Sequence, residues 1–357
     1  MPAATPHLRV DPVRLRRNVR RVAEAAATAG VTLRPHAKTH KCVEVARLQL
    51  ASTAAGLTLA TVGEAEVMVR AGVTDVFLAY PVWVDDDRAA RLRDLAEHAR
   101  VAIGLDSVTG AANAGRRLGG SGIEIMVEVD SGHHRTGVAP GDAGEVALAA
   151  ARAGLEVRGA FTFPGHSYTP GASADAAAQE TAALEAAREA MDAAGVPPRV
   201  LSGGSTPSLA AGLARPRDHA DTVTWELRPG VYVFNDAQQW ELGTCQPDDI
   251  ALTVRATVVS HASGRLVLDA GSKVLGADRA PWSTGWGRLP ERPDARVVQL
   301  SEHHAVVETE GVLPRIGTQV DVVPNHVCSA VNLADVLWVD EPGGLRAWPV
   351  AARGLNG

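Results

Sequence analysis

The feature that most constrains the fold is an alternation of short apolar runs with longer helix-like segments through residues 13–230. About eight strands are expected: one just before Lys38, and the others at 57–60, 76–78, 101–105, 123–129, 157–161, 200–201 and 223–227. Helix-like segments lie at 13–29, 42–50, 65–71, 86–98, 108–118, 143–153 and 176–194. Strands joined by helices indicate α/β architecture, and eight such units favour a closed (β/α)8 barrel over an open doubly wound sheet.

The pattern changes after Gly230. Strand-like runs separated by Gly and Pro turns then dominate, at 251–259, 265–268, 295–300, 305–308, 318–323 and 335–339. This change predicts a C-terminal all-β domain. We expect the barrel domain at 1–240 and the β domain at 241–357, with residues 1–10 as a further strand candidate that could pair with the β domain.

Composition excludes several classes of partner. The chain has 357 residues, 46% of them hydrophobic, and a formal net charge of −6 without any block of like charge. That balance argues against nucleic acid and anionic membrane surfaces as main partners. No secretory signal is visible, the apolar runs are shorter than the ~20 residues a bilayer requires, and three scattered cysteines do not form a disulfide framework. We expect a cytoplasmic protein that acts on a small molecule.

Lys38 is the first candidate for chemistry. The apolar run 31–33 leads into the stretch 34–41, RPHAKTHK, and Pro35 should end the strand and leave Lys38 at its C-terminal mouth. The cations expected nearby, on Arg34, His36, His40 and Lys41, would favour the neutral amine that Schiff-base chemistry needs. The residues alone leave open a second reading, a basic and solvated strand end.

Two Gly-rich or polar turns follow later strands. The stretch 202–207, SGGSTP, comes after roughly the seventh strand, where barrels commonly bind phosphate, so Gly203, Gly204, Ser205 and Thr206 are candidate anion donors. The turn within 127–138 carries Arg135, whose guanidinium could bind a phenolate or carboxylate oxygen. The alternatives are an ordinary turn for the first and a surface ion pair of Asp130 with Arg135 for the second.

The stretch 161–168, FTFPGHSY, ends another strand and offers His166 and Tyr168 as groups that exchange protons or bind a ligand. An ordinary hydrogen-bonding histidine is an equally good reading of His166. The long stretch 277–293, with Trp282 and Trp286, has no strand or helix period and is expected to be a loop that either shapes a substrate pocket or exposes two tryptophans.

His326 and Cys328 form the candidate metal site. At i and i+2 on an extended segment, their side chains would point the same way, and imidazole with thiolate suits a borderline-soft cation such as zinc. Two protein ligands would leave coordination positions open for a substrate. Spacing alone favours the alternative, a buried cysteine beside an ordinary histidine.

Several of these stretches resemble one family. Residues 35–41 resemble the pyridoxal phosphate lysine motif of the D-threonine aldolase and D-serine dehydratase family, whose barrel is alanine racemase-like. The resemblance implies that Lys38 holds the cofactor and that 202–207 binds its phosphate. It also implies that Gly230, Val231 and Tyr232 complete the phosphate site. Arg135 lies in a stretch similar to the family motif D-x-G-x-x-R-x-G, which implies a role for it beside the cofactor.

The resemblance also implies a metal motif, and the chain departs from the family pattern at Phe163. His326-x-Cys328, followed by residues 331–333, is similar to the metal motif of the D-serine dehydratase branch, whereas the aldolase branch commonly carries His-x-Asp. The family usually has a tyrosine where this chain has Phe163, which removes a hydroxyl near the cofactor. His166 or Tyr168 could substitute for it, so the identity of the base stays open.

The family implies a lyase that uses pyridoxal 5'-phosphate and a divalent metal, zinc first with manganese or cobalt as alternatives. Lys38, Arg135 and His166 are the implied catalytic residues. The expected reaction is elimination from a D-β-hydroxy-α-amino acid to a keto acid and ammonia, as in D-serine dehydratase. Retro-aldol cleavage to glycine and an aldehyde is the alternative, and a racemase or a non-catalytic cofactor carrier is less favoured. A homodimer is also implied.

Overall fold

The structure, a computed structural model, describes residues 4–215 and 222–357. It divides into two compact units, each built from separate stretches of chain. The barrel unit comprises Val22–Lys38, Gln49–Gly230 and Leu355–Gly357, and the β unit comprises Met1–Arg21, Thr39–Leu48 and Val231–Gly354. The last long stretch of the β unit begins at Val231, and this unit also takes in two early stretches of the chain.

The barrel unit is built on an eight-stranded parallel sheet in the order β2-β9-β8-β7-β6-β5-β4-β3. Its strands are β2 (Thr32–Leu33), β3 (Leu57–Leu59), β4 (Asp75–Pro81), β5 (Arg100–Leu105), β6 (Glu124–Glu128), β7 (Glu156–Phe161), β8 (Val200–Gly203) and β9 (Thr224–Leu227). A parallel bridge between His36 and Thr58 joins the two ends of this order. The prediction of a closed α/β barrel is thus confirmed.

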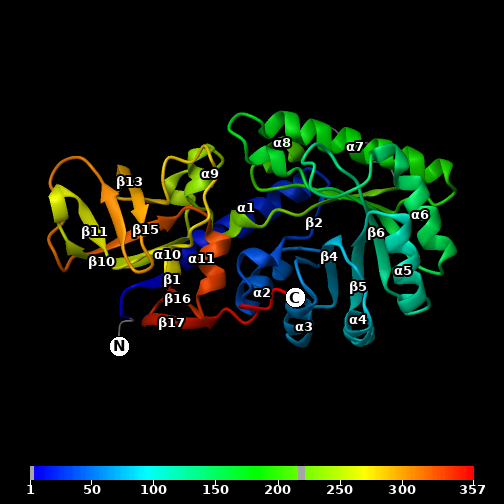
Figure 1. The fold of residues 1–357 in the computed structure, drawn as a ribbon, viewed down its shortest axis with the longest axis horizontal. Coiled ribbons are helices and arrows are strands. Elements are labelled where there is room, and N and C mark those ends of the chain that lie inside the picture. Colours follow the sequence, from blue (N-terminus) through cyan, green and yellow to red (C-terminus); the bar gives the residue numbers. More distant parts are fainter. Residues whose placement is uncertain (1–3, 216–221) are drawn as a thin grey trace. The chain divides into compact units, whose positions relative to one another are not determined.

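Helices follow the strands in the expected alternation. They are α1 (Pro12–Thr28), α2 (Val43–Ala51), α3 (Val62–Arg70), α4 (Asp86–His98), α5 (Val108–Leu118), α6 (Ala143–Arg152), α7 (Ser173–Ala193) and α8 (Leu209–Leu213). Side chains of Thr61, Asp85 and Ser107 cap α3, α4 and α5 by accepting a backbone N–H from the first turn. Figure 1 shows α3 to α7 around the outside of the barrel strands.

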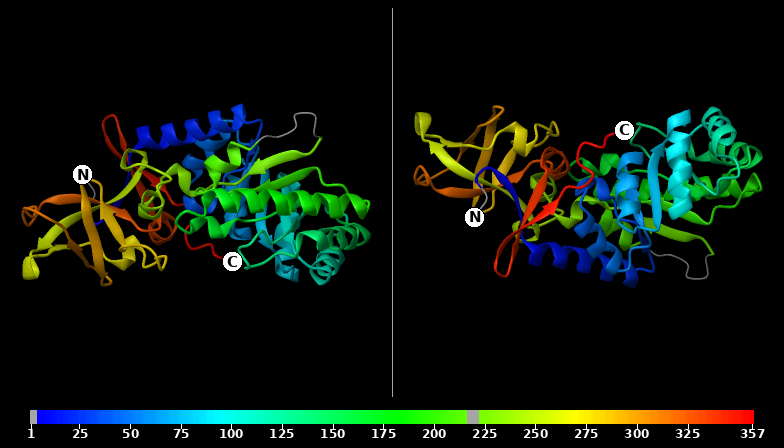
Figure 2. Two further views of the ribbon diagram at one scale, coloured as in Figure 1. Left: turned by 90° about the horizontal axis from the view of Figure 1, so that it is seen from above. Right: turned by 90° about the horizontal axis from the view of Figure 1, so that it is seen from below.

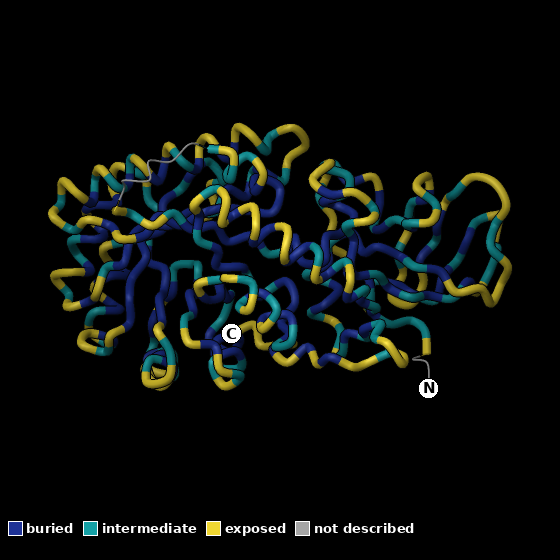
Figure 3. The backbone as a smooth tube through the Cα atoms, turned by 180° about the vertical axis from the view of Figure 1, so that it is seen from behind, coloured by how far each residue is buried: buried dark blue, intermediate teal, exposed yellow. Residues whose placement is uncertain are grey.

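Apolar side chains fill both faces of the barrel wall. Phe77, Ala102, Met126, Phe161 and Val200 form one buried cluster, with the rings of Phe77 and Phe161 edge to face at 5.0 Å. A second cluster packs α6 and α7 against β6, β7 and β8. Figure 3 shows the buried backbone running through this unit and the exposed segments along its outside.

Arg34 takes part in a buried ion-pair network. Its guanidinium binds Glu226 at 2.7 Å and Asp75 at 2.6 Å, and the side chain is 1% exposed. The charge of Arg34, one of the cations expected near Lys38, is thus paired with two carboxylates. The Nδ1 atoms of His36 and His40 accept the backbone N–H groups of Lys38 and Cys42, at 3.4 and 3.1 Å.

The β unit contains a nine-stranded sheet in the order β11-β14-β13-β12-β15-β10-β1-β16-β17, with β11 also paired to β10. Its strands are β1 (His7–Val10), β10 (Leu252–Ser260), β11 (Leu266–Leu268), β12 (Gly287–Leu289), β13 (Arg292–Leu300), β14 (Ala305–Glu308), β15 (Gln319–Pro324), β16 (Val336–Glu341) and β17 (Gly344–Pro349). The β11–β10 pairing closes six of these strands into an antiparallel barrel. Figure 2 shows this unit from two further sides.

β1 lies between two strands from the far end of the chain. It pairs antiparallel with β10, with Leu8 opposite Val254, and parallel with β16, with Arg9 opposite Trp338. β1, which lies within the stretch 1–10 expected as a strand candidate, therefore joins the β sheet. The short strands β12 and β17 are not predicted from the sequence, and β12 lies inside the stretch expected as a loop.

The β unit carries three further helices: α9 (Ala237–Glu241), α10 (Ser272–Leu275) and α11 (Val327–Leu333). None of the helices in the described part of the chain combines the length and apolar character needed to cross a membrane.

Candidate active site

Lys38 lies in a single 3-10 turn, Ala37–Thr39, directly beyond the C-terminal end of β2. Its Nζ atom is 5.7 Å from the centre of the Phe163 ring, and its backbone N–H donates to Nδ1 of His36. The lysine is half-buried. The predicted placement of Lys38 at the C-terminal mouth of a barrel strand agrees with this geometry.

Three polar side chains of the barrel unit lie against the ring of Phe163. The Cζ atom of Arg135 is 5.2 Å from the ring centre, and the imidazole of His133 meets the ring edge to face at 5.5 Å. Lys38 contacts the same ring. The position where the family usually has tyrosine thus remains central to the site, with an aromatic face toward two cations and without a hydroxyl.

His133 was not among the predicted site residues. A Cβ atom on Gly165 would lie 2.5–2.6 Å from three atoms of its imidazole, so this ring packs where only glycine leaves room. Burial lowers the pKa of His133, and the nearby charges of Arg135 and His166 lower it further. The glycine before His166 was the only sequence signal for this contact.

His166 lies in the turn Gly165–Tyr168, and its Nε2 atom is 2.8 Å from Oε1 of Gln179 on α7. Its Nδ1 atom is buried and has no hydrogen-bond partner among the described residues. Tyr168, at the end of the same turn, is half-buried. Asp130 accepts from the N–H groups of Gly132 and His134 and binds the His134 ring at 2.6 Å, so the predicted alternative of an Asp130–Arg135 ion pair is not what forms.

The Gly-rich loop follows β8 and is tightly held by side chains. Gly204 has φ +89°, which favours glycine, and its N–H donates to Oε1 of the buried Glu180 at 2.5 Å. Oγ of Ser205 lies 2.7 Å from Oγ of Ser167 and 2.8 Å from Oγ of Ser208. A Cβ atom on Gly203 would clash with Glu180. Glu180 is a second residue that sequence reasoning missed, because it reaches the loop from α7.

Arg228 is buried beside this loop. It donates to Oγ of Ser202 and to the backbone oxygen of Thr162, both at 2.6 Å, and its N–H donates to the backbone oxygen of Gly203. Burial lowers the pKa of Arg228 to about 10, although Glu226 and Glu180 oppose the shift. Gly230 ends this part of the barrel unit, and Val231 and Tyr232 begin the 3-10 turn that opens the last stretch of the β unit.

His326 and Cys328 do not lie on an extended segment, so the predicted conformation was wrong. β15 ends at Pro324, His326 is the N-cap of α11, and Cys328 lies in the first turn of that helix. Asp236, the N-cap of α9, accepts the N–H of Val327 at 3.1 Å and so satisfies one donor of the first turn of α11. The side chains of His326 and Cys328 nevertheless contact each other.

Electrostatics around His326 suit a cation. Burial lowers its pKa, but Cys328 and Asp278 outweigh burial and raise the pKa well above the ordinary histidine value. Oδ2 of Asp278 lies 2.5 Å from Nδ1 of His326, and Sγ of Cys328 lies 3.4 Å from Oγ1 of Thr39, which directly follows Lys38 in the chain. An imidazole and a thiol in contact are a donor pair that suits a divalent cation.

The stretch 277–293 packs onto this segment. Asn325 donates from Nδ2 to the backbone oxygen of Asp278 at 3.0 Å, and Ser283 donates to Oδ1 of Asn325 at 2.8 Å. Trp286 is half-buried beneath the guanidinium of Arg279, 4.3 Å from its ring centre. The alternative of two fully exposed tryptophans therefore does not hold.

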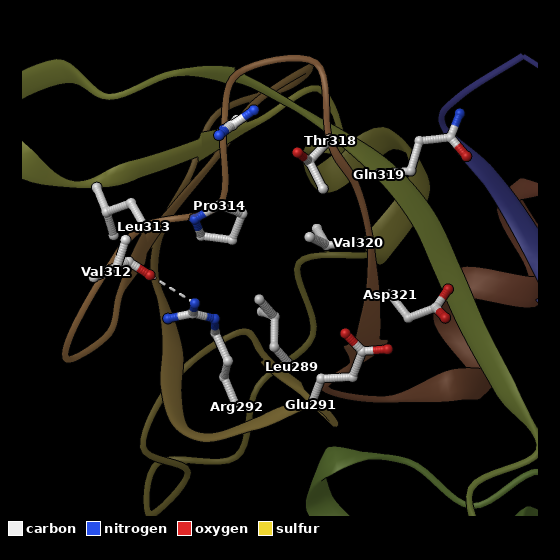
Figure 4. A pocket seen from close by; sticks show the side chains of 11 residues that line it. Leu289, Glu291, Arg292, Val312, Leu313, Pro314, Thr318, Gln319, Val320 and Asp321 are labelled. Carbon is white, nitrogen blue, oxygen red and sulfur yellow. Dashed lines mark hydrogen bonds between the residues drawn. The ribbon is translucent and has the colours of Figure 1, made fainter.

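A cavity of about 400 Å³ lies elsewhere in the β unit, between β12, β15 and the turn before β15. Figure 4 shows its lining, including Arg292, which donates to the backbone oxygen of Val312 at 2.7 Å. Its lining includes Leu289, Glu291 and Arg292 of the stretch 277–293, but none of the individually predicted catalytic, cofactor or metal residues.

Two parts of the chain match models of known protein families. Residues 10–238 match the family model for the alanine racemase N-terminal domain, and residues 251–339 match that for a serine dehydratase domain. The first match covers most of the barrel unit, and the second ends beyond α11.

Relatives match over nearly the whole length. The chain is 33% identical to D-threo-3-hydroxyaspartate dehydratase of Delftia sp. (strain HT23), over 91% of this chain and 91% of that protein. It is 31% identical to D-threonine aldolase of Arthrobacter sp., over 99% of this chain and 93% of that protein. The solved structure of the Delftia dehydratase has a TM-score of 0.88 at 30% identity, covering 98% of this chain and 97% of that one. A cysteine-to-alanine variant of D-threo-3-hydroxyaspartate dehydratase, in its metal-free form, matches equally well, with a TM-score of 0.88.

Proposed function

Because this chain belongs to the family of pyridoxal phosphate-dependent lyases that includes D-threo-3-hydroxyaspartate dehydratase and D-threonine aldolase, we propose that it eliminates water from a D-β-hydroxy-α-amino acid. The products are a keto acid and ammonia. The observation that carries the proposal is the contact of His326 with Cys328 at the start of α11, beside Asp278.

The barrel unit fits pyridoxal phosphate. Lys38 provides the covalent attachment, and the phosphate is bound by the loop Gly203–Thr206 together with Gly230, Val231 and Tyr232. Gly203 and Gly204 support this assignment. A Cβ atom on Gly203 would clash with Glu180, and the φ of +89° at Gly204 favours glycine, so the loop backbone carries no side chain at these two positions. The N–H of Gly204 already donates to Glu180, so hydroxyl groups of the loop contribute more to anion binding than we expected from the sequence. When bound, the cofactor supplies the electron sink for bond cleavage at Cα.

The donor set of the β unit fits a divalent cation. One imidazole and one thiolate suit zinc, with manganese or cobalt as alternatives. Such a cation supplies a Lewis acid for the departing hydroxyl. The metal-free form of the cysteine-to-alanine variant in the related dehydratase supports the role of Cys328.

The remaining roles belong to side chains around Phe163. Arg135 orients an oxygen of the cofactor or substrate through its forked donors. A neutral imidazole accepts the Cα proton, and His166 is the first candidate because one of its nitrogens is buried without a partner in the described structure. His133 and Tyr168 are the alternatives.

Retro-aldol cleavage is the second candidate, favoured by the similarity to D-threonine aldolase. In that reaction the β-hydroxyl loses its proton and the Cα–Cβ bond breaks. The cysteine ligand, in place of the aspartate common in aldolases, favours elimination. A cofactor carrier is less consistent with the chain because the β unit and its metal motif would then have no role.

The experiment is product analysis. Holoenzyme is incubated separately with D-serine, D-threonine and D-threo-3-hydroxyaspartate, with Lys38→Ala as the inactive control. Keto acid and ammonia are the expected products, and glycine with an aldehyde would replace elimination by retro-aldol cleavage. No turnover of any of the three would leave the carrier as the better description.

A further inference from the structure

We propose that Asp278 orients His326 for metal binding and thereby sets the affinity of the β unit for a divalent cation. This inference rests on the proposed function, since it takes His326 and Cys328 as the ligands. Asp278 would be a positioning residue, because it acts through the imidazole.

The contact selects one nitrogen of the imidazole. Oδ2 of Asp278 is 2.5 Å from Nδ1 of His326, so the proton of the neutral ring stays on Nδ1. Nε2 is then the nitrogen left to bind the cation. Metal-binding histidines generally donate their other ring N–H to a carboxylate or carbonyl, which fixes the ring and raises its basicity. Asp278 meets that description without being a ligand itself.

The position of Asp278 is fixed by several bonds rather than by the ion pair alone. Its backbone oxygen accepts from Nδ2 of the buried Asn325, the residue before His326, at 3.0 Å. Asn325 is held in turn by Ser283 at 2.8 Å. Ser329, one turn into α11, approaches Oδ2 of Asp278 at 3.4 Å. The segment that carries the ligands and the segment that carries Asp278 are therefore locked together on both sides of His326.

Asp278 is too exposed for its ion pair with His326 to stabilise the fold much, so a positioning role can be distinguished from a structural one. Its side chain is 53% exposed, against 27% for His326. An ion pair this exposed contributes little to stability. Removing the carboxylate should therefore leave the fold and the barrel unit's cofactor site unchanged and act on metal affinity.

The experiment measures zinc affinity of the cofactor-loaded protein by competition with a chromogenic chelator. The variants are Asp278→Ala and Asp278→Asn, and the matched control is Asp335→Asn, which removes an exposed carboxylate of the same unit that pairs with Arg353. We expect zinc to bind about 10–100-fold more weakly to Asp278→Ala. Asp278→Asn, which keeps an oxygen acceptor without the charge, should fall between it and the wild type. Asp335→Asn should match the wild type.

Two further readouts decide among explanations. Unchanged zinc affinity in both Asp278 variants, alongside lost zinc binding in His326→Ala, would overturn the inference while leaving the proposed metal site intact. Zinc binding retained by His326→Ala would instead overturn the metal site of the proposed function. If the Asp278 variants also lost the cofactor's absorption band or unfolded at lower temperature without metal, the role would be structural, and the positioning role would be overturned.

Discussion

At the scale of single residues, the chain contains three lysines, Lys38, Lys41 and Lys273, and their surroundings differ. Lys41 donates to Asn332 at 2.7 Å, and Lys273 pairs with Glu302 at 2.7 Å on an exposed surface. Lys38 lies against Phe163. We expect the purified protein to be yellow and to lose that colour on borohydride reduction, with the reduced adduct on Lys38 by peptide mapping. An adduct on either other lysine would contradict the assignment.

Glu128 gives the barrel unit a pH-dependent stability. Burial raises the pKa of this carboxyl to about 7, although Thr136, Arg135 and Arg228 oppose the shift. Its folded pKa is above its unfolded value, so the folded state holds the extra proton and loses stability as pH rises from about 4.5 to 7. Above that window the cost is constant.

Glu128→Gln should remove this dependence. In the cofactor-free protein, the variant's free energy of unfolding should exceed that of the wild type by a margin that grows by about 2–3 kcal/mol from pH 5 to pH 8, at ~1.4 kcal/mol per pKa unit. Urea unfolding at the two pH values measures it. An equal difference between variant and wild type at both pH values would mean that this carboxyl does not titrate in the window.

At the scale of elements, the segment from β15 to α11 carries the proposed metal ligands, His326 and Cys328. Lewis-acid stabilisation is worth several kcal/mol, and each ~1.4 kcal/mol is tenfold in rate. Cys328→Ala or chelation should therefore slow turnover at least about a hundredfold, and the protein should stay yellow because Lys38 belongs to the other unit. Cys328→Asp should recover part of the activity, with a shift of metal preference toward manganese.

The measurement is turnover of metal-stripped protein with and without added zinc. Equal rates would mean that His326 and Cys328 have a structural role, and the metal-assisted reaction would have to be abandoned.

The same segment shows how far the sequence predicts the site. The resemblance to a family motif identified the pair His326 and Cys328, which spacing alone did not, but the contact of Val327 with Asp236 comes from 91 residues earlier in the chain. Asp278 and Glu180 were missed for a similar reason, since each reaches its partner from a separate element. Residues adjacent to a motif were predictable, whereas partners brought by tertiary structure were not.

At the scale of the whole molecule, the barrel was predictable because each strand and helix has its own apolar period. Strands such as β3 and β5 and helices such as α4 and α5 lie within a residue or two of their expected bounds. Pairing of the N-terminal strand with the β domain was expected, but the stretch 39–48 was not expected in the β unit, because its packing there is not encoded by any local pattern. Three-residue β12 carries too little pattern to detect.

We also predict a homodimer in which the β unit of one subunit covers the barrel mouth of the other. A mouth open to water would expose reactive species to side reactions, so covering it has a chemical purpose. Light scattering combined with activity measurement tests this. A fully active monomer at assay concentration would contradict the prediction.

The position of β1 between β10 and β16 has a consequence for synthesis on the ribosome. At about 5–20 residues per second, this strand waits on the order of tens of seconds before both neighbours have emerged. Until then the edges of β1 are open, and in a chain that lacks β1 the matching edge of β10 is open; such an edge is a template for pairing with other chains. A fragment of residues 231–357 made alone should therefore aggregate, and a separately supplied peptide of residues 1–21 should restore its solubility. A soluble, folded 231–357 fragment without the peptide would show that β1 is dispensable.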